Sequence, residues 1–276
     1  MSRLRIISCF YCIFAVYINY LFYKHRDNML SKNVIKLVHS LAMKKNRQRE
    51  GLFVAEGRKT VEDLMRKILP ELIVATDGWV PPAGYAGRMI RATEEELHKV
   101  SFLKTPQQVL ALFPMAANAS SPVAADFSRR LCLALDGVQD PGNLGTIIRI
   151  ADWFGIETIL CSPDTADVYN PKVVQATMGS LAHVDVVYTD LPALLDTLPD
   201  GTPVYGTLLD GENIYARQLS DHGIIVMGNE GNGISPAVRS RITDRLLIPS
   251  FARGDTAESL NVAVATAVVC SEFRRK

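Results

Sequence analysis

Short apolar runs alternate with helical patterns through the second half of the chain, and this alternation constrains the fold more than any other feature. The runs are Leu131–Leu135, Thr158–Cys161, Val184–Tyr188, Val204–Thr207, Ile224–Met227 and Arg245–Ile248. Between most of them lie segments of helical period, at Leu144–Phe154, Pro171–Gly179, Leu191–Leu198 and Pro236–Ile242. Strands that are buried on both faces and separated by helices form a mainly parallel sheet. We therefore predict a doubly wound α/β domain over residues 127–276, which ends with a helix at Ser259–Phe273.

The preceding residues 29–116 predict a smaller, mixed α/β domain. Its candidate strands are Leu52–Ala55, Leu72–Thr76, Met89–Arg91 and Val109–Phe113, and its candidate helices are Val34–Met43, Lys59–Lys67 and Thr93–Val100. The stretch Ala117–Ala125 consists of small residues without a hydrophobic period, so residues 117–126 are predicted to be a linker. The whole chain is 48% hydrophobic and 21% charged, as folded globular proteins are, so both domains can bury a core.

Residues 1–28 form a separate hydrophobic extension. Ile6–Tyr23 is almost continuously apolar, and its length falls within the roughly 17–25 residues that a membrane helix needs. No small-x-small cleavage site follows it, which disfavours a signal peptide. Two interpretations remain: a membrane anchor, or translation from an upstream start codon with the native chain beginning at Met29. We favour the second, because an amphipathic helix follows Met29 at once. We therefore expect a cytoplasmic protein with no membrane partner unless Ile6–Tyr23 is genuine.

Basic residues cluster near the start of the first domain, although the formal net charge of the chain is only +1. The cluster contains Lys32, Lys36, Lys44, Lys45, Arg47, Arg49, Arg58 and Lys59, opposed only by Glu50 and Glu56. Such a cluster can neutralise the phosphates of a nucleic acid, whereas a solvated helix and loop face would show the same composition.

The sequence predicts no metal site. Cys9 and Cys12 form a CxxC, but neither a second pair nor a nearby histidine follows at zinc spacing. The five histidines are scattered, and Cys132, Cys161 and Cys270 lie in apolar segments, as small core residues do. This cysteine pattern suits a reducing compartment.

Polar residues follow three of the predicted strands at the point where each strand ends. These segments are 136–145 (DGVQDPGNLG), 228–235 (GNEGNGIS) and 248–261, which ends in Ser-Leu-Asn. Ligands of parallel sheets bind beyond the carboxyl ends of the strands. The glycines of 228–235 follow GxxGxG rather than the dinucleotide fingerprint GxGxxG, which argues against a nicotinamide-dependent oxidoreductase. From the residues alone, we predict a pocket for a polar small molecule.

The same segments resemble the motifs of the SpoU (TrmH) branch of the SPOUT RNA methyltransferases. The matching stretches are DPGNLGTIIRIADWFGI at 140–156, GNEGNGIS at 228–235 and IPS…ESLNVAVATAVV at 248–269. In the first domain, LFVAEGRKTVEDL and TPQQVLALF resemble the family's substrate-binding domain, which is related in fold to ribosomal protein L30. The resemblance implies a SPOUT-type α/β knot, in which the carboxyl-terminal chain forms a deep trefoil knot. It also implies S-adenosyl-L-methionine as methyl donor, no metal, and a homodimer whose active sites are each completed by the partner.

The motifs also imply a set of site residues. Backbone groups around Gly228, Ile248 and Leu260, with Asn229 and Gly233, would bind the cofactor. The implied catalytic set is Arg149, Asn143, Glu230, Ser259 and Asn261. Arg149 would act as the base or as an electrostatic and phosphate-binding group, because a free guanidinium stays protonated. Glu230 would orient Arg149 or the loop 228–235 by a charge-assisted hydrogen bond, and Asn143 would position the ribose or the cofactor. Ser259 and Asn261 would bring polar side chains to the same rim, or cap the last helix.

These expectations describe an S-adenosylmethionine-dependent RNA 2′-O-ribose methyltransferase. The first domain resembles those of enzymes that act on large ribosomal RNA. Structured ribosomal RNA is therefore favoured over tRNA, with a guanosine as the candidate nucleoside, and DNA is not expected. Two alternatives stay open: a tRNA 2′-O-methyltransferase, and a relative that binds RNA without catalysis.

Overall fold

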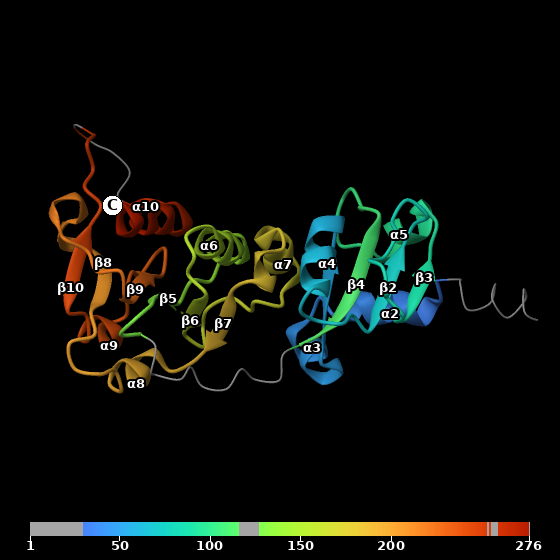
Figure 1. Cartoon of the computed structure of the whole chain (residues 1–276), viewed down its shortest axis with the longest axis horizontal. Coiled ribbons are helices and arrows are strands. Elements are labelled where there is room, and N and C mark those ends of the chain that lie inside the picture. The colour runs from blue at the N-terminus through green and yellow to red at the C-terminus, as the bar shows by residue number, and fades with distance from the viewer. Residues whose placement is uncertain (1–29, 116–126, 253, 255–258, 276) are drawn as a thin grey trace, which may run out of the picture.

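The computed structural model describes residues 30–115, 127–252, 254 and 259–275. The hydrophobic extension 1–28 and the linker 117–126 lie outside these ranges. The described residues form two domains that lie side by side along the long axis of the molecule (Figure 1). None of the helices in these ranges has the length and hydropathy that a membrane crossing requires.

The N-terminal domain is built on a four-stranded mixed sheet. Its strands are β1 (Leu52–Glu56), β2 (Leu72–Ala75), β3 (Met89–Arg91) and β4 (Val109–Pro114), in the order β1-β4-β2-β3. β4 pairs antiparallel with β1 and with β2, whereas β2 and β3 are parallel. All four strands predicted from the sequence are confirmed.

Helices cover both faces of this sheet. On one face, α2 (Lys32–Ser40) and α5 (Glu94–Val100) pack with Val54 of β1, and on the other α4 (Arg58–Met65) packs with Phe53. Neighbouring residues enter opposite cores because side chains alternate along a strand. A further helix, α3 (Lys44–Glu50), was not predicted, because its residues KKNRQRE have no apolar period. It ends at Gly51, whose φ of 66° is left-handed.

The C-terminal domain is built on a six-stranded sheet in which every strand pair is parallel. Its strands are β5 (Leu131–Asp136), β6 (Thr158–Cys161), β7 (Asp185–Tyr188), β8 (Val204–Asn213), β9 (Gly223–Gly228) and β10 (Asp244–Leu247), in the order β10-β8-β9-β5-β6-β7. The predicted doubly wound parallel sheet is thus confirmed, and the trefoil knot stays a prediction. β8 is longer than predicted, because a register shift between Arg245 and Leu246 lets β10 pair with its polar end.

Helices cover both faces of the parallel sheet as well (Figure 1). Leu133 of β5 faces a core that includes α6 (Pro141–Trp153), α7 (Pro171–Thr177) and α10 (Val262–Arg274). Its neighbour Ala134 faces the other core, with α8 (Leu191–Leu195) and α9 (Pro236–Arg239). α6 packs closely on α7 at Gly145, where an added Cβ would lie 2.4 Å from the Cβ of Ala176. The glycine therefore sets the distance between these two helices.

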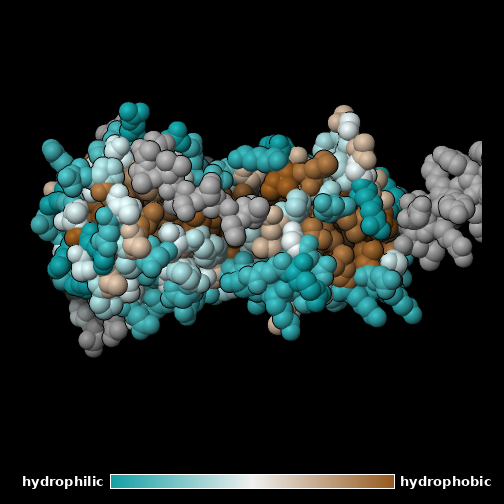
Figure 2. Space-filling model, turned by 90° about the horizontal axis from the view of Figure 1, so that it is seen from below, coloured by the Kyte–Doolittle hydropathy of each residue, from teal (hydrophilic) through white to brown (hydrophobic). Residues whose placement is uncertain are grey.

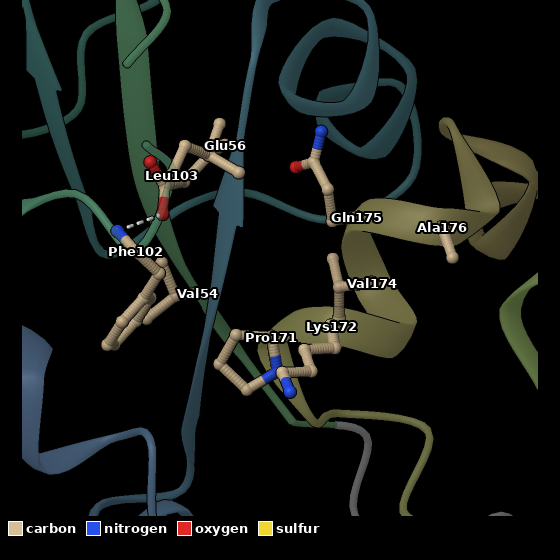
Figure 3. A pocket seen from close by; sticks show the side chains of 9 residues that line it. All are labelled: Val54, Glu56, Phe102, Leu103, Pro171, Lys172, Val174, Gln175 and Ala176. Atoms are coloured by element: carbon tan, nitrogen blue, oxygen red, sulfur yellow. Dashed lines mark hydrogen bonds between the residues drawn. The ribbon is translucent and has the colours of Figure 1, made fainter. Parts of the chain in front are cut away.

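The two domains meet where α7 lies beside the edge strand β1. The rings of Phe53 and Tyr169 are 4.7 Å apart between centroids, and Val174 of α7 belongs to the same apolar cluster as Phe53. A helix at a strand edge shields backbone groups that could otherwise pair with another chain. A cavity of about 280 Å³ remains between β1, Phe102 and Lys172, so the junction is only partly filled (Figure 3).

Glu56 lines this cavity and leads to a prediction about pH. Its carboxylate accepts hydrogen bonds from Phe102 N at 2.8 Å and from the Ser101 hydroxyl, yet burial raises the pKa of Glu56 above its ordinary value. A carboxyl whose pKa is raised in the folded state has no effect on stability while the pH is below its unfolded-state pKa. As the pH rises from that value through the folded-state pKa, the unfolded chain ionises more readily and the free energy of unfolding falls. We expect Glu56→Gln to raise the unfolding temperature at about pH 8 and to leave it unchanged at about pH 4. Calorimetry beside the exposed control Glu71→Gln measures this, and an equal gain at both pH values contradicts it.

Candidate functional site

The carboxyl ends of β5 and β9 lie side by side, because the pairing of these strands sets Asp136 opposite Gly228. Asp136 is buried, and its Oδ2 accepts a hydrogen bond from Ser235 N at 2.7 Å. The backbone O of Gly137 accepts one from Asn229 Nδ2, also at 2.7 Å. The loop after β9 is therefore bonded to the loop after β5 at two points. Sequence analysis did not single out Asp136, although an acidic residue at the end of a buried strand is a signal that could have found it.

The loop 228–235 is compact because its own backbone and Asn229 tie it together. Asn229 and Gly233 exchange two backbone hydrogen bonds of 2.9 Å, and Asn229 Oδ1 accepts from the N–H groups of Gly231 and Asn232. A Cβ on Gly228 would lie 2.4 Å from the carbonyl carbon of Gly233, so residue 228 must be glycine. The Asn229 side chain, predicted to contact a cofactor, is thus engaged in holding the loop, and Gly233 shapes it with a φ of 69°.

Side chains from all three motifs form one hydrogen-bonded chain. Asn143 Nδ2 donates to Glu230 Oε1 at 2.7 Å, and Asn261 Nδ2 donates to Asn143 Oδ1 at 3.0 Å. A carboxylate can only accept, so Glu230 fixes the orientation of the Asn143 amide and, through it, that of Asn261. We call this chain the Asn–Asn–Glu relay. It unites residues that lie 87 and 118 positions apart in the sequence.

Each asparagine of the relay sits at the start of a helix. Asp140 caps α6 by accepting from Asn143 N at 2.8 Å. Asn261 caps α10, since its Oδ1 accepts from Ala263 N at 3.0 Å and from Val264 N at 3.3 Å. The helix caps therefore hold the relay residues at the sheet edge, and the capping role considered for Asn261 is confirmed.

Arg149 is not brought to the relay within one chain. It is exposed on α6, and among the described residues none forms a hydrogen bond or ion pair with it. At about 100° and 1.5 Å per residue, Arg149 lies about 120° around the helix from Asn143 and about 9 Å along it. Glu230 bonds to Asn143 and not to Arg149, so of the two expectations for this carboxylate the one that it orients Arg149 is not met within one chain. Ser259 is likewise exposed and lies just before α10.

Large apolar side chains are exposed on α6, which carries Arg149, and at the start of α10. Trp153, one turn further along α6, is 85% exposed. Val264 on α10 is 52% exposed, and Leu260 just before this helix is 51% exposed. The two helices run alongside one another, since Asn261 bonds to Asn143 near their first turns and Arg274 bonds to the carbonyl of Phe154 near their last.

The described residues hold no group of three or more histidine, cysteine or acidic side chains that could bind a metal ion. Cys161 and Cys270 are buried in the core, and burial raises the pKa of both thiols, so neither is poised as a nucleophile. Within one chain this edge offers amides, the carboxylates of Asp136, Asp140 and Glu230, and backbone groups, with the exposed Arg149 further along α6.

Two family models match the chain. Residues 130–271 match the SpoU rRNA Methylase family, and residues 32–111 match the MRM3-like substrate binding domain. The first match covers the parallel sheet with all three loops of the site, and the second covers the mixed sheet.

Similar proteins agree with these matches. The 23S rRNA (guanosine(2553)-2′-O)-methyltransferase RlmP of Bacillus subtilis is 34% identical over 239 residues, which are 85% of this chain and 93% of that protein. A structure from Porphyromonas gingivalis assigned to the TrmH family of RNA methyltransferases superposes with a TM-score of 0.80 at 42% identity, covering 89% of this chain and 98% of its own. A structure of an AdoMet-bound rRNA methyltransferase from Sinorhizobium meliloti superposes with a TM-score of 0.76 at 27% identity, covering 90% of this chain and 96% of its own. The resemblance stated from the motifs is confirmed.

The relay predicts the effect of a single substitution at its centre. Asn143→Asp removes the donor and places a second carboxylate 2.7 Å from that of Glu230, so the two anions repel one another. We expect faster amide hydrogen exchange at residues 229–233 and a loss of about 1 kcal/mol in the free energy of unfolding. Asn143→Ala removes the hydrogen bond without adding charge and should give a smaller increase in exchange. If neither variant exchanges faster than the unchanged protein, the relay does not hold the loop.

Proposed function

The chain belongs to the SpoU rRNA methylase family, and from this membership we propose that it transfers a methyl group from S-adenosylmethionine to a ribose 2′-hydroxyl of RNA. The observation that carries the proposal is the Asn–Asn–Glu relay, which joins the three family motifs at one sheet edge. The relatives support it, because the Bacillus subtilis protein is named for 2′-O-methylation of 23S rRNA and the Sinorhizobium meliloti structure for bound AdoMet.

The residues around this edge fit S-adenosylmethionine. When bound, the cofactor supplies a methyl group on a sulfonium, which is activated for in-line displacement. Ile248 is half-buried and Leu260 half-exposed, and both lie in loops whose backbone groups can bond to the edge of an adenine ring while the side chains contact its face. We assign the backbone around Gly228, Ile248 and Leu260 to this surface. Asn229 and Gly233 contribute by shaping the loop.

The relay residues act by positioning the ribose. Methyl transfer needs the 2′-oxygen behind the methyl group, and holding two reactants in line supplies much of the rate of such a displacement. Because Glu230 fixes the Asn143 amide, the polar groups that face the ribose do not have to reorganise when it binds. Ser259 and Asn261, at the start of α10, complete the polar rim.

We assign Arg149 to the active site of the neighbouring subunit. It is exposed one helical turn from Trp153 on α6, and Val264 and Leu260 are exposed at the start of the adjoining α10. An exposed tryptophan among further exposed apolar side chains marks a protein interface. A homodimer formed on this face would bury Trp153 and carry Arg149 towards the partner's relay. There its guanidinium would bind a phosphate beside the target ribose and stabilise the developing alkoxide.

Ribosomal RNA is the substrate that we propose, with a guanosine as the target. The support is the similarity over most of the chain to a protein named for a guanosine of 23S rRNA, together with the match to a substrate-binding domain. A tRNA substrate is the alternative that mapping would reveal. We also propose a cytoplasmic location, which is compatible with a ribosomal RNA substrate.

The N-terminal domain supplies a basic surface for this RNA. Four residues of the basic cluster pair with carboxylates: Arg47, Arg49, Arg58 and Lys59. The other four, Lys32, Lys36, Lys44 and Lys45, are exposed on α2 and α3 and pair with no carboxylate in the described ranges. Figure 2 shows the face of the molecule on which α3 lies, with hydrophilic residues gathered near the domain junction. Unpaired ammonium groups are the ones that can displace counterions from phosphates.

Arg149→Ala should abolish methylation of ribosomal RNA, while S-adenosylmethionine binds as to the unchanged protein. Mixing this variant with Asn143→Ala tests the assignment to the neighbouring subunit. If Arg149 acts across the dimer, each mixed dimer regains one intact site, so about a quarter of the activity returns after random exchange of subunits. 2′-O-methyl mapping and cofactor calorimetry measure the outcome. No recovery on mixing would place Arg149 in its own subunit, and full turnover by Arg149→Ala would remove it from the reaction.

Lys44→Ala/Lys45→Ala should weaken RNA binding and reduce its dependence on salt. Two lost phosphate contacts lower the slope of log affinity against log salt by about 1.5. The control Arg58→Ala/Arg66→Ala removes the same net charge from residues already paired with Glu62 and Asp63, and should leave the slope near that of the unchanged protein. Filter binding at several salt concentrations measures the slopes, and equal slopes for the two double variants would exclude α3 from the RNA surface.

A further inference from the structure

Arg47 is the one lysine or arginine that is buried among the described residues, with 1% of its surface exposed. It lies on α3, between the exposed Lys45 and Arg49. Its Nη1 donates to the carbonyls of Leu41 at 2.7 Å and Ala42 at 2.8 Å, which close the end of α2. Two of the five guanidinium donors are thus bonded within the N-terminal domain, which holds the side chain in one orientation.

The remaining bond of Arg47 crosses to the other domain. Nη2 donates to Asp167 Oδ2 at 2.5 Å, in the loop 162–170 between β6 and α7. Nε has no hydrogen-bond partner in the described part of the chain. A buried charge is tolerated only when it is paired and hydrogen-bonded, so this ion pair holds only in one relative placement of the domains.

The loop that carries Asp167 also supports the candidate active site. Ala166 N donates to the carbonyl of Val138 at 2.9 Å, and Gly137 N donates to Ser162 Oγ at 2.8 Å. Val138 lies two residues before Asp140, the cap of the helix that begins with Asn143. A continuous path of hydrogen bonds and short chain segments therefore joins the N-terminal domain to the relay.

The rest of the domain junction does not define one orientation in the same way. Phe53, Tyr169 and Val174 make apolar contacts, which are not directional. An open pocket of about 280 Å³ lies beside them, so the apolar contact between the domains is interrupted along this edge of the junction (Figure 3). Apolar contact of this kind allows small rotations, whereas the ion pair of Arg47 is lost when the domains rotate.

We propose that Arg47 is a positioning residue of the methyltransferase. Through Asp167 it fixes the RNA-binding surface of α2 and α3 at a set distance from the relay, so that RNA held by the N-terminal domain presents its target ribose at the active site. This inference rests on the proposed function. It adds that the two domains work as one rigid unit in which a single buried ion pair sets the geometry.

The test uses Arg47→Met and Asp167→Asn in the full chain. We expect kcat/KM for RNA to fall roughly ten- to a hundredfold in Arg47→Met, because a misplacement of about 1 Å is enough for such a loss. The affinity for S-adenosylmethionine should stay within about twofold, because the cofactor surface lies in the C-terminal domain. Asp167→Asn keeps the size of the side chain and should show the same pattern with a smaller loss. The double variant should be no worse than Arg47→Met alone, since both changes break one contact.

Two further variants separate geometry from charge and from stability. Arg47→Lys keeps the charge but cannot bond to two carbonyls and a carboxylate in a fixed fork, so it should recover only part of the activity. Arg241→Met makes the matched change at a surface pair with Asp196 inside the C-terminal domain and should leave the kinetics unchanged. Amide hydrogen exchange in the loop 162–170, which includes Asp167, should be faster in Arg47→Met than in Arg241→Met.

The proposal is overturned if Arg47→Met retains the kcat/KM of the unchanged protein, or if its cofactor affinity falls in step with its activity. Full recovery by Arg47→Lys would also overturn it, because charge alone would then suffice. If the unchanged protein methylates no RNA, the proposed function fails, and hydrogen exchange still decides the positioning role: identical exchange in the loop 162–170 of Arg47→Met and Arg241→Met overturns it.

Discussion

The parallel pairing of β5 with β9 is the constraint on which the rest of the structure depends. It sets Asp136 opposite Gly228, so two loops that lie far apart in the sequence begin at neighbouring points of one sheet edge. The backbone N–H and C=O groups of buried strands must be hydrogen-bonded, so β5 and β9 cannot easily shift along one another. Once the register is set, the hydrogen bonds from Ser235 N to Asp136 and from Asn229 to Gly137 follow from proximity.

Function is built on this edge by fixed polar groups rather than by an unusual reactive side chain. The buried cysteines have raised pKa values, and the relay consists of two amides and one carboxylate. Such a site suits a reaction in which the methyl donor carries the activation and the protein supplies orientation. We propose that a second subunit completes the site, because Arg149 and Trp153 are both exposed on α6.

The domain junction uses two kinds of contact with different consequences. The apolar packing of α7 beside β1 buries surface between the domains without favouring one orientation. The Arg47–Asp167 ion pair is directional and sets the orientation of one domain relative to the other. The loop 162–170 takes part in both, and it bonds to the loop after β5 as well. The N-terminal domain is thus attached to the site through the same segment that supports the site.

The sequence by itself determined the parallel sheet, the four strands of the N-terminal domain and the three loops of the site, because strand burial and glycine-rich turns leave local patterns. It also determined, through the motifs, the family. Only the tertiary structure decided which of eight basic residues is buried, since Arg47 and its neighbour Arg49 have the same chemistry and differ only in where α3 packs. α3 itself has no apolar period, so its packing left no local signal. Likewise, the bond of Glu230 to Asn143 rather than to Arg149 depends on strand register and on the rotation of α6, which arise from contacts between distant segments.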